Sequence, residues 1–256
     1  MNINSKKLIK SSKEIILMRQ SCKYLAQMME YITPLIIEGN TPLQLDKAAY
    51  DFIVDHKCKS AFLGYNVGFG PFPNTLCIGI NDMALHGIPS SIPFKKGDIV
   101  TIDAGLVWKG FYSDMARTFT IGNVSKDKKI FIDTVRQAVD KAILEAQDGN
   151  HVGDISYAIH SNSRPYHPLR DFSAHGIGQK LHMDPIIPMA YGNKGDGMLL
   201  QSGMTLAIEA NVNMGNEEIV TDESGWTTHT KDGSMFALFE NTILITGTGV
   251  EILTLP

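Results

Sequence analysis

One ten-residue pattern occurs twice in this chain of 256 residues, and each copy sets an acid in the middle of an apolar, strand-like run. KGDIVTIDAG (96–105) and SGMTLAIEAN (202–211) align without gaps. Glycine is the second residue of each segment, and six residues later a carboxylate follows Ile and precedes Ala; it is Asp103 in the first copy and Glu209 in the second. We infer that two related strands carry an acid at the same position.

A second, shorter match follows in the same order. DMARTFTIG begins at Asp114 and ENTILITG begins at Glu240, and in both segments an acid precedes a β-branched run that ends in glycine. Either match alone has an ordinary explanation in the composition of strands, but both together indicate an internal duplication. The two predicted halves span about 1–123 and 124–256, and each contributes two acids.

Asp103 and Asp114 both lie in a hairpin that we predict over 98–122. A turn centred between Trp108 and Lys109 puts the two acids directly opposite each other, whereas a turn one residue further along makes them diagonal neighbours on the same face. Adjacent like charges destabilise a sheet, and burial would raise the pKa of both carboxyl groups. The hairpin by itself also fits an exposed edge strand with solvated acids, so this alternative stays open.

Helical and strand patterns follow one another in the order helix, helix, strands, and this order occurs twice. Capping boxes at Ser11 and Thr41 begin the first two predicted helices, Ser125 begins the third, and Gly149 is predicted to end it. The four predicted helices span 11–33, 41–57, 125–149 and 153–163. From Asp171 to the end of the chain, glycines separate short β-rich runs.

Composition narrows the class of protein. With 43% hydrophobic and 20% charged residues the chain is of ordinary globular type, and it has no stretch near the roughly 20 apolar residues of a membrane helix. The first twenty residues lack the apolar core of a secretory signal, so we expect a cytoplasmic protein. A net charge of −4 favours neither nucleic acid nor an anionic membrane as a partner. The scattered cysteines, expected to be free thiols, are Cys22, Cys58 and Cys77.

The acids need cations if they converge inside the protein. Glu209 and Glu240 would project toward the first two acids if the halves pack about a pseudo-twofold axis. Among the eight histidines, His175 stands out, because the small residues of SAHGIGQ leave its imidazole unobstructed. Four carboxylates and one neutral imidazole are balanced by two divalent cations, so we predict a dinuclear site. Oxygen-rich ligation with one nitrogen suits Mn, Fe, Co or Zn.

These residues belong to a longer pattern that covers nearly the whole chain. Its five key positions are Asp103, Asp114 eleven residues later, His175 in HGIG, Glu209 in AIEANV and Glu240 in FENT. It continues through ALHGIP, HGIGQKLHMDP, SGWTTHTKDGSMFALFENTI and EILTL. In order and spacing the pattern resembles the type I methionine aminopeptidases. The resemblance implies an α/β pita-bread fold, in which two pseudo-twofold-related halves form a curved antiparallel sheet covered by helices, as one catalytic domain over 1–256.

The resemblance also implies a metal-binding role for each of the five positions. Asp103 would bind one ion and His175 with Glu209 the other, while Asp114 and Glu240 would bridge both. In such enzymes a metal-bridging hydroxide attacks the carbonyl after the first residue. Glu209 would then act as the proton shuttle.

Two further histidines and an apolar pocket complete the implied active site. His182 would polarise the carbonyl and stabilise the oxyanion, and His86 would contact the scissile amide or the leaving amine. Aromatic and thiol side chains suit a flexible thioether, as in a methionine pocket. The matching positions are Phe62, Tyr65, Phe72, Cys77 and Trp226.

The implied activity is removal of the N-terminal methionine from nascent polypeptides and short peptides with a small second residue, by a monomer; association with ribosomes stays open. Three residues next to the expected ligands depart from those usual in the family: Ala174, Ala210 and Asn241. The segment YNVGFGPFP is also longer than its usual counterpart, so the pocket around Phe72 is less closely matched.

Two alternative functions stay open. A proline-specific aminopeptidase shares the metal centre but usually adds a large N-terminal domain, which the short segment before the second predicted helix would not form. A divergent paralogue of low activity could act as a binding protein. Such relatives typically lose ligands, whereas all five are present here.

Overall fold

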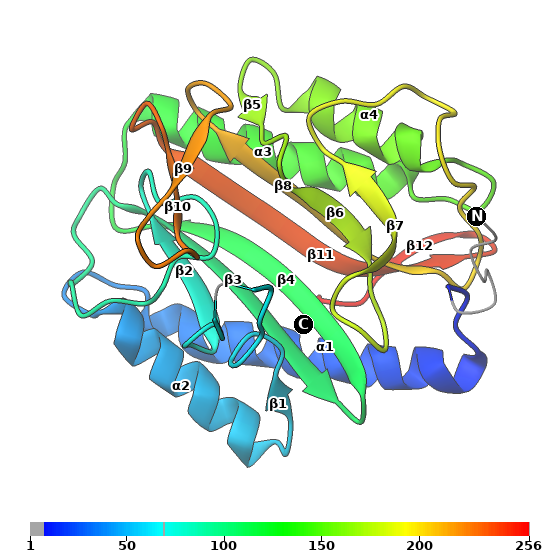
Figure 1. Cartoon of the computed structure of the whole chain (residues 1–256), viewed down its shortest axis with the longest axis horizontal. Helices are drawn as coiled ribbons and strands as arrows, with labels where there is room; N and C mark the ends of the chain where they lie inside the picture. The colour runs from blue at the N-terminus through cyan, green and yellow to red at the C-terminus, as the bar shows by residue number, and fades with distance from the viewer. Residues whose placement is uncertain (1–7, 69, 256) are drawn as a thin grey trace.

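A ten-stranded sheet runs through the computed structural model of the chain, which describes residues 8–68 and 70–255 (Figure 1). Its main path is β1-β3-β4-β11-β8-β6-β7, and β2, β5 and β12 pair with β3, β8 and β11. The strands of this sheet are β1 (Lys59–Ser60), β2 (Leu76–Ile80), β3 (Ile99–Trp108), β4 (Phe111–Thr120), β5 (His167–Pro168), β6 (Ser173–Gly176), β7 (Met183–Pro188), β8 (Thr205–Asn213), β11 (Phe236–Thr246) and β12 (Gly249–Ile252). A separate two-stranded sheet pairs β9 (Ile219–Thr221) with β10 (Thr228–Thr230).

The helices begin where the sequence predicts. The capping boxes at Ser11 and Thr41 are both formed, and the Ser125 side chain accepts a hydrogen bond from the Lys128 amide at the start of α3. The elements are α1 (Ser12–Ile32), the short 3-10 helix η2 (Thr33–Leu35), α2 (Pro42–Asp55), α3 (Lys126–Glu145) and α4 (Val152–Asn162).

The predicted end of the third helix is wrong. This helix, α3, ends at Glu145 rather than at Gly149. Asn150 Nδ2 donates to the Glu145 carbonyl over 2.9 Å, and the Ala146 amide bonds back to Ile143, so the last turn is satisfied without a glycine. Gly149, with φ of 90°, instead forms the turn that leads to α4.

The four acid-bearing strands lie next to one another in the order β3-β4-β11-β8. The two predicted copies therefore meet at their second strands, β4 and β11, which run antiparallel with Glu240 opposite Ala116. The glycines that open the first matched segments, Gly97 and Gly203, have similar φ angles of 93° and 91°. The duplication seen in the sequence is thus also a structural repeat.

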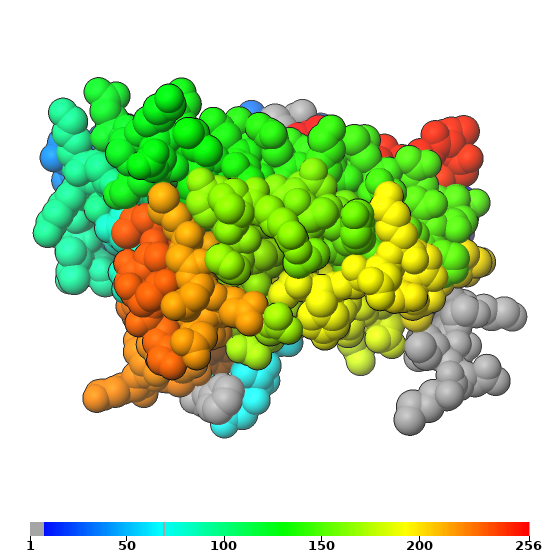
Figure 2. All heavy atoms as spheres, turned by 90° about the horizontal axis from the view of Figure 1, so that it is seen from above, coloured from blue at the N-terminus to red at the C-terminus, as the bar shows by residue number. Residues whose placement is uncertain are grey.

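The helices cover one face of this sheet. Alternate residues of β3, such as Ile102, pack with α1 and α2, and alternate residues of β8, such as Ile208, pack with α3 and α4. Each such side chain, when fully buried, contributes about 1.5–3 kcal/mol of hydrophobic stabilisation. Figure 2 shows the molecule from above, with the α3 region in green along one side and the segment around β9 and β10 in orange toward the other. Within the described ranges, none of the helices is both long and apolar enough to cross a membrane.

Candidate metal centre

Strand register brings the four acids to the face of the sheet opposite the helices. In the first hairpin Asp103 pairs with Ala116 and Asp114 with Gly105, so the two acids are diagonal neighbours. The turn therefore lies at Lys109 and Gly110, the second of the two predicted positions. Because side chains directly opposite each other project to the same face, both carboxylates point the same way.

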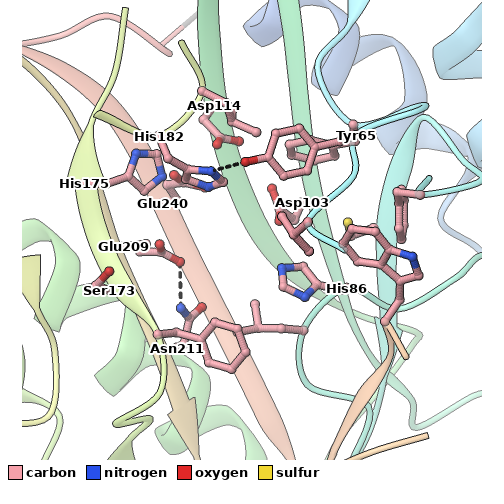
Figure 3. Close-up of a pocket in the computed structure, with 18 of the residues that line it drawn as sticks. Tyr65, His86, Asp103, Asp114, Ser173, His175, His182, Glu209, Asn211 and Glu240 are labelled. Carbon is pink, nitrogen blue, oxygen red and sulfur yellow. Dashed lines mark hydrogen bonds between the residues drawn. The ribbon is translucent and has the colours of Figure 1, made fainter. Parts of the chain in front are cut away.

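The second half reaches the same face by a different register. Glu209 on β8 lies directly opposite Glu240 on β11, and Glu240 is in turn opposite Ala116 of β4. Ala116 also pairs with Asp103, so a continuous row of paired positions links the two halves. Asp103, Glu240 and Glu209 lie in this row, and Asp114 lies two residues before Ala116 on β4. All four acids project into one space, as Figure 3 shows. The alternative of solvated acids on an edge strand is excluded, because Asp114 and Glu240 are only 4% and 3% exposed.

His175 joins the acids from the neighbouring strand β6. It lies opposite Ala207, two residues before Glu209 on β8, and so shares the face of that acid. Its Nδ1 lies 2.9 Å from the Gly176 carbonyl oxygen. A carbonyl only accepts hydrogen bonds, so Nδ1 carries the proton and Nε2 keeps a free lone pair. The glycine that follows is required, because a Cβ at Gly176 would lie 2.0 Å from the Asp184 carbonyl oxygen.

The geometry of three of these side chains already matches a metal site. Ligand atoms of Asp114, His175 and Glu240 all lie within 4.8 Å of one another, and all three residues are buried. They come from the two central strands and from β6, so both halves of the chain contribute.

Ionising the four acids is costly in the metal-free protein, because they are buried close to one another. Burial raises the pKa of Asp103 to about 7 and that of Glu209 to about 8. Burial and the neighbouring acids raise the pKa values of Asp114 and Glu240 well above the usual range. Arg117 lies behind this row, where it donates to the Glu240 carbonyl and to the Asn241 side chain rather than to the acids.

Unsatisfied ligand atoms indicate what is needed to balance this charge. Among the described residues, the Oδ1 atoms of Asp103 and Asp114 are buried without a hydrogen-bond partner. Such atoms are costly in a folded protein unless they bind a cation. Oxygen ligands from four carboxylates and one imidazole nitrogen fit divalent ions of the Mn, Fe, Co and Zn type. The donor set therefore fits the predicted dinuclear site.

All twelve predicted site residues line one cavity of about 310 Å³. The five metal-ligand candidates form its floor, and Phe72 and Trp226 form part of an aromatic wall with ring centroids 5.3 Å apart. The twelve are Phe62, Tyr65, Phe72, Cys77, His86, Asp103, Asp114, His175, His182, Glu209, Trp226 and Glu240.

The other two histidines stand on opposite sides of the acids. The His182 ring meets that of His175 edge-on, with centroids 4.5 Å apart. His86 lies edge-on to Trp226 and to Phe172, at 5.9 and 5.6 Å. Burial lowers the pKa values of His86 and His175 to about 4, so both imidazoles are neutral at pH 7.

The three residues that depart from the family pattern point away from the cavity. Ala174 and Ala210 are buried in the core between the sheet and the helices. Asn241, the residue after Glu240, faces the same way, and its Oδ1 accepts hydrogen bonds from Arg117 Nη2 at 2.7 Å and from Thr254 Oγ1 at 3.0 Å.

Asn211 contacts a ligand candidate directly but was not among the predicted site residues. Asn211 Nδ2 donates to Glu209 Oε2 over 2.7 Å, and the side chain is 1% exposed. The alternation of a strand is the signal that predicts it, because residues two apart on β8 share a face. The cavity-lining residues that were not predicted are Val67, Leu85, Asp171, Phe172, Ser173, Leu181, Ile186 and Asn211.

Comparison with known proteins gives one consistent family. Residues 16–247 match metallopeptidase family M24. The methionine aminopeptidase of Clostridium perfringens is 40% identical over 250 residues, which cover 97% of this chain and 98% of that protein. The crystal structure of methionine aminopeptidase from Thermotoga maritima has a TM-score of 0.92 at 37% identity and covers 97% of this chain and 99% of its own. The prolidase of Pyrococcus horikoshii, at 21% identity and a TM-score of 0.75, shares the fold, and the match covers 64% of its length.

Proposed function

The chain belongs to metallopeptidase family M24, and we propose that it removes the N-terminal methionine from polypeptides whose second residue is small. The observation that carries this proposal is a single cavity with two unlike walls. Buried acids and an imidazole line one part of it, and an apolar aromatic and thiol surface lines the other. A methionyl peptide has the matching parts, namely a thioether side chain and, next to it, an amine and a carbonyl.

The residues that would hold the metal ions are the five candidates of the cavity floor. Asp103 would bind one ion and His175 with Glu209 the second, with Asp114 and Glu240 between them. When bound there, divalent ions act as Lewis acids and lower the pKa of water. The metal is one of Co, Mn, Fe or Zn, all of which accept this mixture of oxygen and nitrogen ligands.

Proton transfer falls to Glu209. Its Oε2 accepts the hydrogen bond from Asn211, which holds the carboxylate in one orientation. From this position Glu209 would take a proton from the attacking water and deliver it to the departing amine. The neutral imidazole of His182 would donate to the carbonyl oxygen as negative charge develops on it.

Substrate selection depends on the other side of the cavity. The methionine side chain would lie among Phe62, Phe72, Cys77 and Trp226, where a polarisable thioether packs well against aromatic rings. His86 would contact the scissile amide. Phe172 and Trp226 both lie edge-on to its ring, and this packing would limit the room for a bulky second residue.

The test is cleavage of short peptides by the full chain, stripped of metal and then supplied separately with Co²⁺, Mn²⁺, Fe²⁺ or Zn²⁺. Met-Ala-Ser should release methionine only in the presence of one or more of these ions, Met-Phe-Ser should release far less, and Leu-Ala-Ser should be a poor substrate. Metal-independent release, or equal cleavage of all three peptides, would contradict the proposal.

The setting in which the enzyme acts is also a proposal. We expect nascent polypeptides and short peptides in the cytoplasm to be its substrates and a monomer to be the active form. Under the conditions of the cleavage assay, the molar mass of the protein measured by light scattering should equal that of one chain, 28.2 kDa.

A further inference from the structure

Tyr65 and His182 meet at the cavity although 117 residues separate them in the sequence. The Tyr65 hydroxyl oxygen lies 2.9 Å from His182 Nδ1, shown as a dashed line in Figure 3. The rings themselves meet edge-on, with centroids 5.7 Å apart. A residue that served only as an apolar pocket wall would not need this hydroxyl contact.

We propose that Tyr65 is a positioning residue, whose hydroxyl donates to His182 Nδ1 and thereby fixes the imidazole with its proton on Nε2. This inference rests on the proposed function, in which His182 donates to the carbonyl oxygen of the substrate. An imidazole can do so only from a nitrogen that carries a proton. Tyr65 would therefore hold His182 ready to donate before the substrate arrives.

The direction of the hydrogen bond follows from the partners available. Burial raises the pKa of the Tyr65 phenol, so its oxygen keeps its proton. Within the described part of the chain, His182 Nδ1 is the one hydrogen-bond partner of this hydroxyl. If Nδ1 were the donor instead, the phenol proton would have no acceptor among the described residues and would turn to water. Donation from Tyr65 to Nδ1 pairs this proton within the protein and leaves the other imidazole nitrogen, Nε2, to carry the ring proton.

The backbone holds Tyr65 firmly enough to act in this way. Its amide donates to the Phe62 carbonyl over 2.8 Å, and its carbonyl accepts from the Phe72 amide over 2.7 Å. The Gly64 amide, next to Tyr65, donates to the Phe72 carbonyl over 2.9 Å. Both polar groups of the Tyr65 backbone are therefore bonded within this loop.

The loop that carries His182 is fixed from the other half of the chain. It connects β6 to β7, and its Gly178 carbonyl accepts from the Tyr112 amide of β4 over 2.7 Å. The Gly178 amide in turn bonds to the Lys180 carbonyl over 3.1 Å. Two separately anchored loops thus approach each other, and the hydroxyl contact joins them over the cavity.

The variant Tyr65→Phe tests the proposal, because it keeps the ring and removes only the hydroxyl. The readout is the tautomer of His182, measured from the nitrogen–proton correlations of the imidazole by NMR in the Zn²⁺-loaded full chain. The wild type should show the proton on Nε2, and Tyr65→Phe should show a mixture of both tautomers. His86 serves as an internal reference and should keep one pattern in both proteins.

Kinetics give a second readout with a matched control. For Met-Ala-Ser, Tyr65→Phe should lower kcat about tenfold with little change in KM, as expected for a group needed in the transition state. The control is Tyr112→Phe, a tyrosine of the same apolar cluster, whose hydroxyl forms no hydrogen bond with a histidine within the described residues. This control should leave both kcat and the His182 tautomer unchanged.

Two outcomes would overturn the proposal: a wild-type His182 protonated on Nδ1, or a tautomer that Tyr65→Phe leaves unchanged. The wild-type protein could also show the His182 proton on Nε2 and yet cleave no methionyl peptide. In that case the tautomer assignment stands and the proposed function fails.

Discussion

The two halves of the sheet bring their acids together by different registers. Asp103 and Asp114 are offset by two residues across β3 and β4, whereas Glu209 and Glu240 lie directly opposite each other across β8 and β11. Both arrangements put the carboxylates on the face opposite the helices. The duplication therefore preserved the face of the sheet and not the pairing of the acids.

The outer strands of the two halves differ more. Thr101 and Ala207 occupy the same position of the repeat; Ala207 is opposite His175, but Thr101 is opposite Gly79. No side chain fits at Gly79, because a Cβ there would lie 2.5 Å from the Met83 carbonyl oxygen. The second half therefore supplies the one nitrogen ligand candidate. On the same outer strand as Gly79, the first half instead places Cys77 opposite Asp103, beside the apolar pocket.

The strongest test of this comparison is at the central strands, where the halves should be equivalent. Asp114→Asn and Glu240→Gln each remove a proposed bridging ligand, and each should lower activity by more than about 100-fold, the upper cost of losing a residue that only orients a ligand, and weaken both metal sites. His175→Ala changes only the outer strand and should impair one of the two sites. Calorimetric titration with metal measures how many ions each variant binds. If Asp114→Asn and Glu240→Gln bind very different numbers of ions, the two central strands are not equivalent.

Metal removal should next expose the cost of burying the acids. In the metal-free protein the folded-state pKa values of Asp103 and Glu209, about 7 and 8, lie above those of unfolded chains, so the folded state binds more protons. Their contribution to stability is complete at low pH and is lost as the pH rises through 7 to 8. Between pH 6.5 and 9, above the range in which His86 and His175 titrate, Tm should therefore fall.

Saturating metal should reverse this loss. At a hundredfold excess of metal over Kd the folded state gains about 2.7 kcal/mol, which corresponds to roughly 5–10 °C in Tm for a chain of this size. The gain should grow with pH, because the ligands must be deprotonated. Thermal unfolding with EDTA and with metal across this pH range measures both effects, and identical Tm values would count against the site.

Much of the site could be predicted from the sequence, because the four acids occur at matching positions of an internal repeat that the sequence still shows. The choice between opposed and diagonal acids could not be made, since it depends on a turn in which both Lys109 and Gly110 have positive φ, and a lysine gives no signal for that conformation. The contact of Tyr65 with His182 was also beyond prediction, because it joins two loops whose conformations are set by tertiary hydrogen bonds. The roles of the individual site residues remain predictions.

A smaller effect is expected at Asn211, whose side chain holds only Glu209. Asn211→Leu keeps the approximate volume and removes the hydrogen bond to Glu209. Activity should fall about 10–100-fold, the usual cost of losing a group that orients a metal ligand. Asn211→Gln offers a longer amide and should recover part of the loss. If Asn211→Leu keeps full kcat, the contact does not orient Glu209.

The smallest effect concerns the outer strand of the first half. Gly79→Ala places a methyl group against the Met83 carbonyl and should lower the free energy of unfolding by about 1–3 kcal/mol. Gly247→Ala is the matched control, because nothing lies within 4 Å of its Cβ position, and it should change stability by less than about 0.5 kcal/mol. Denaturant unfolding measures the stability of both variants. If Gly79→Ala leaves the free energy of unfolding unchanged, close packing is not what keeps a metal-binding side chain out of this position of β2.

We propose that acids from both halves and one imidazole together hold two divalent ions. Anomalous X-ray diffraction from crystals of the Mn²⁺-loaded full chain tests it most directly. Two anomalous peaks are expected side by side, bound by Asp103, Asp114, His175, Glu209 and Glu240, with Asp114 and Glu240 touching both. A single peak bound by residues of one half alone, or peaks elsewhere in the molecule, would contradict it.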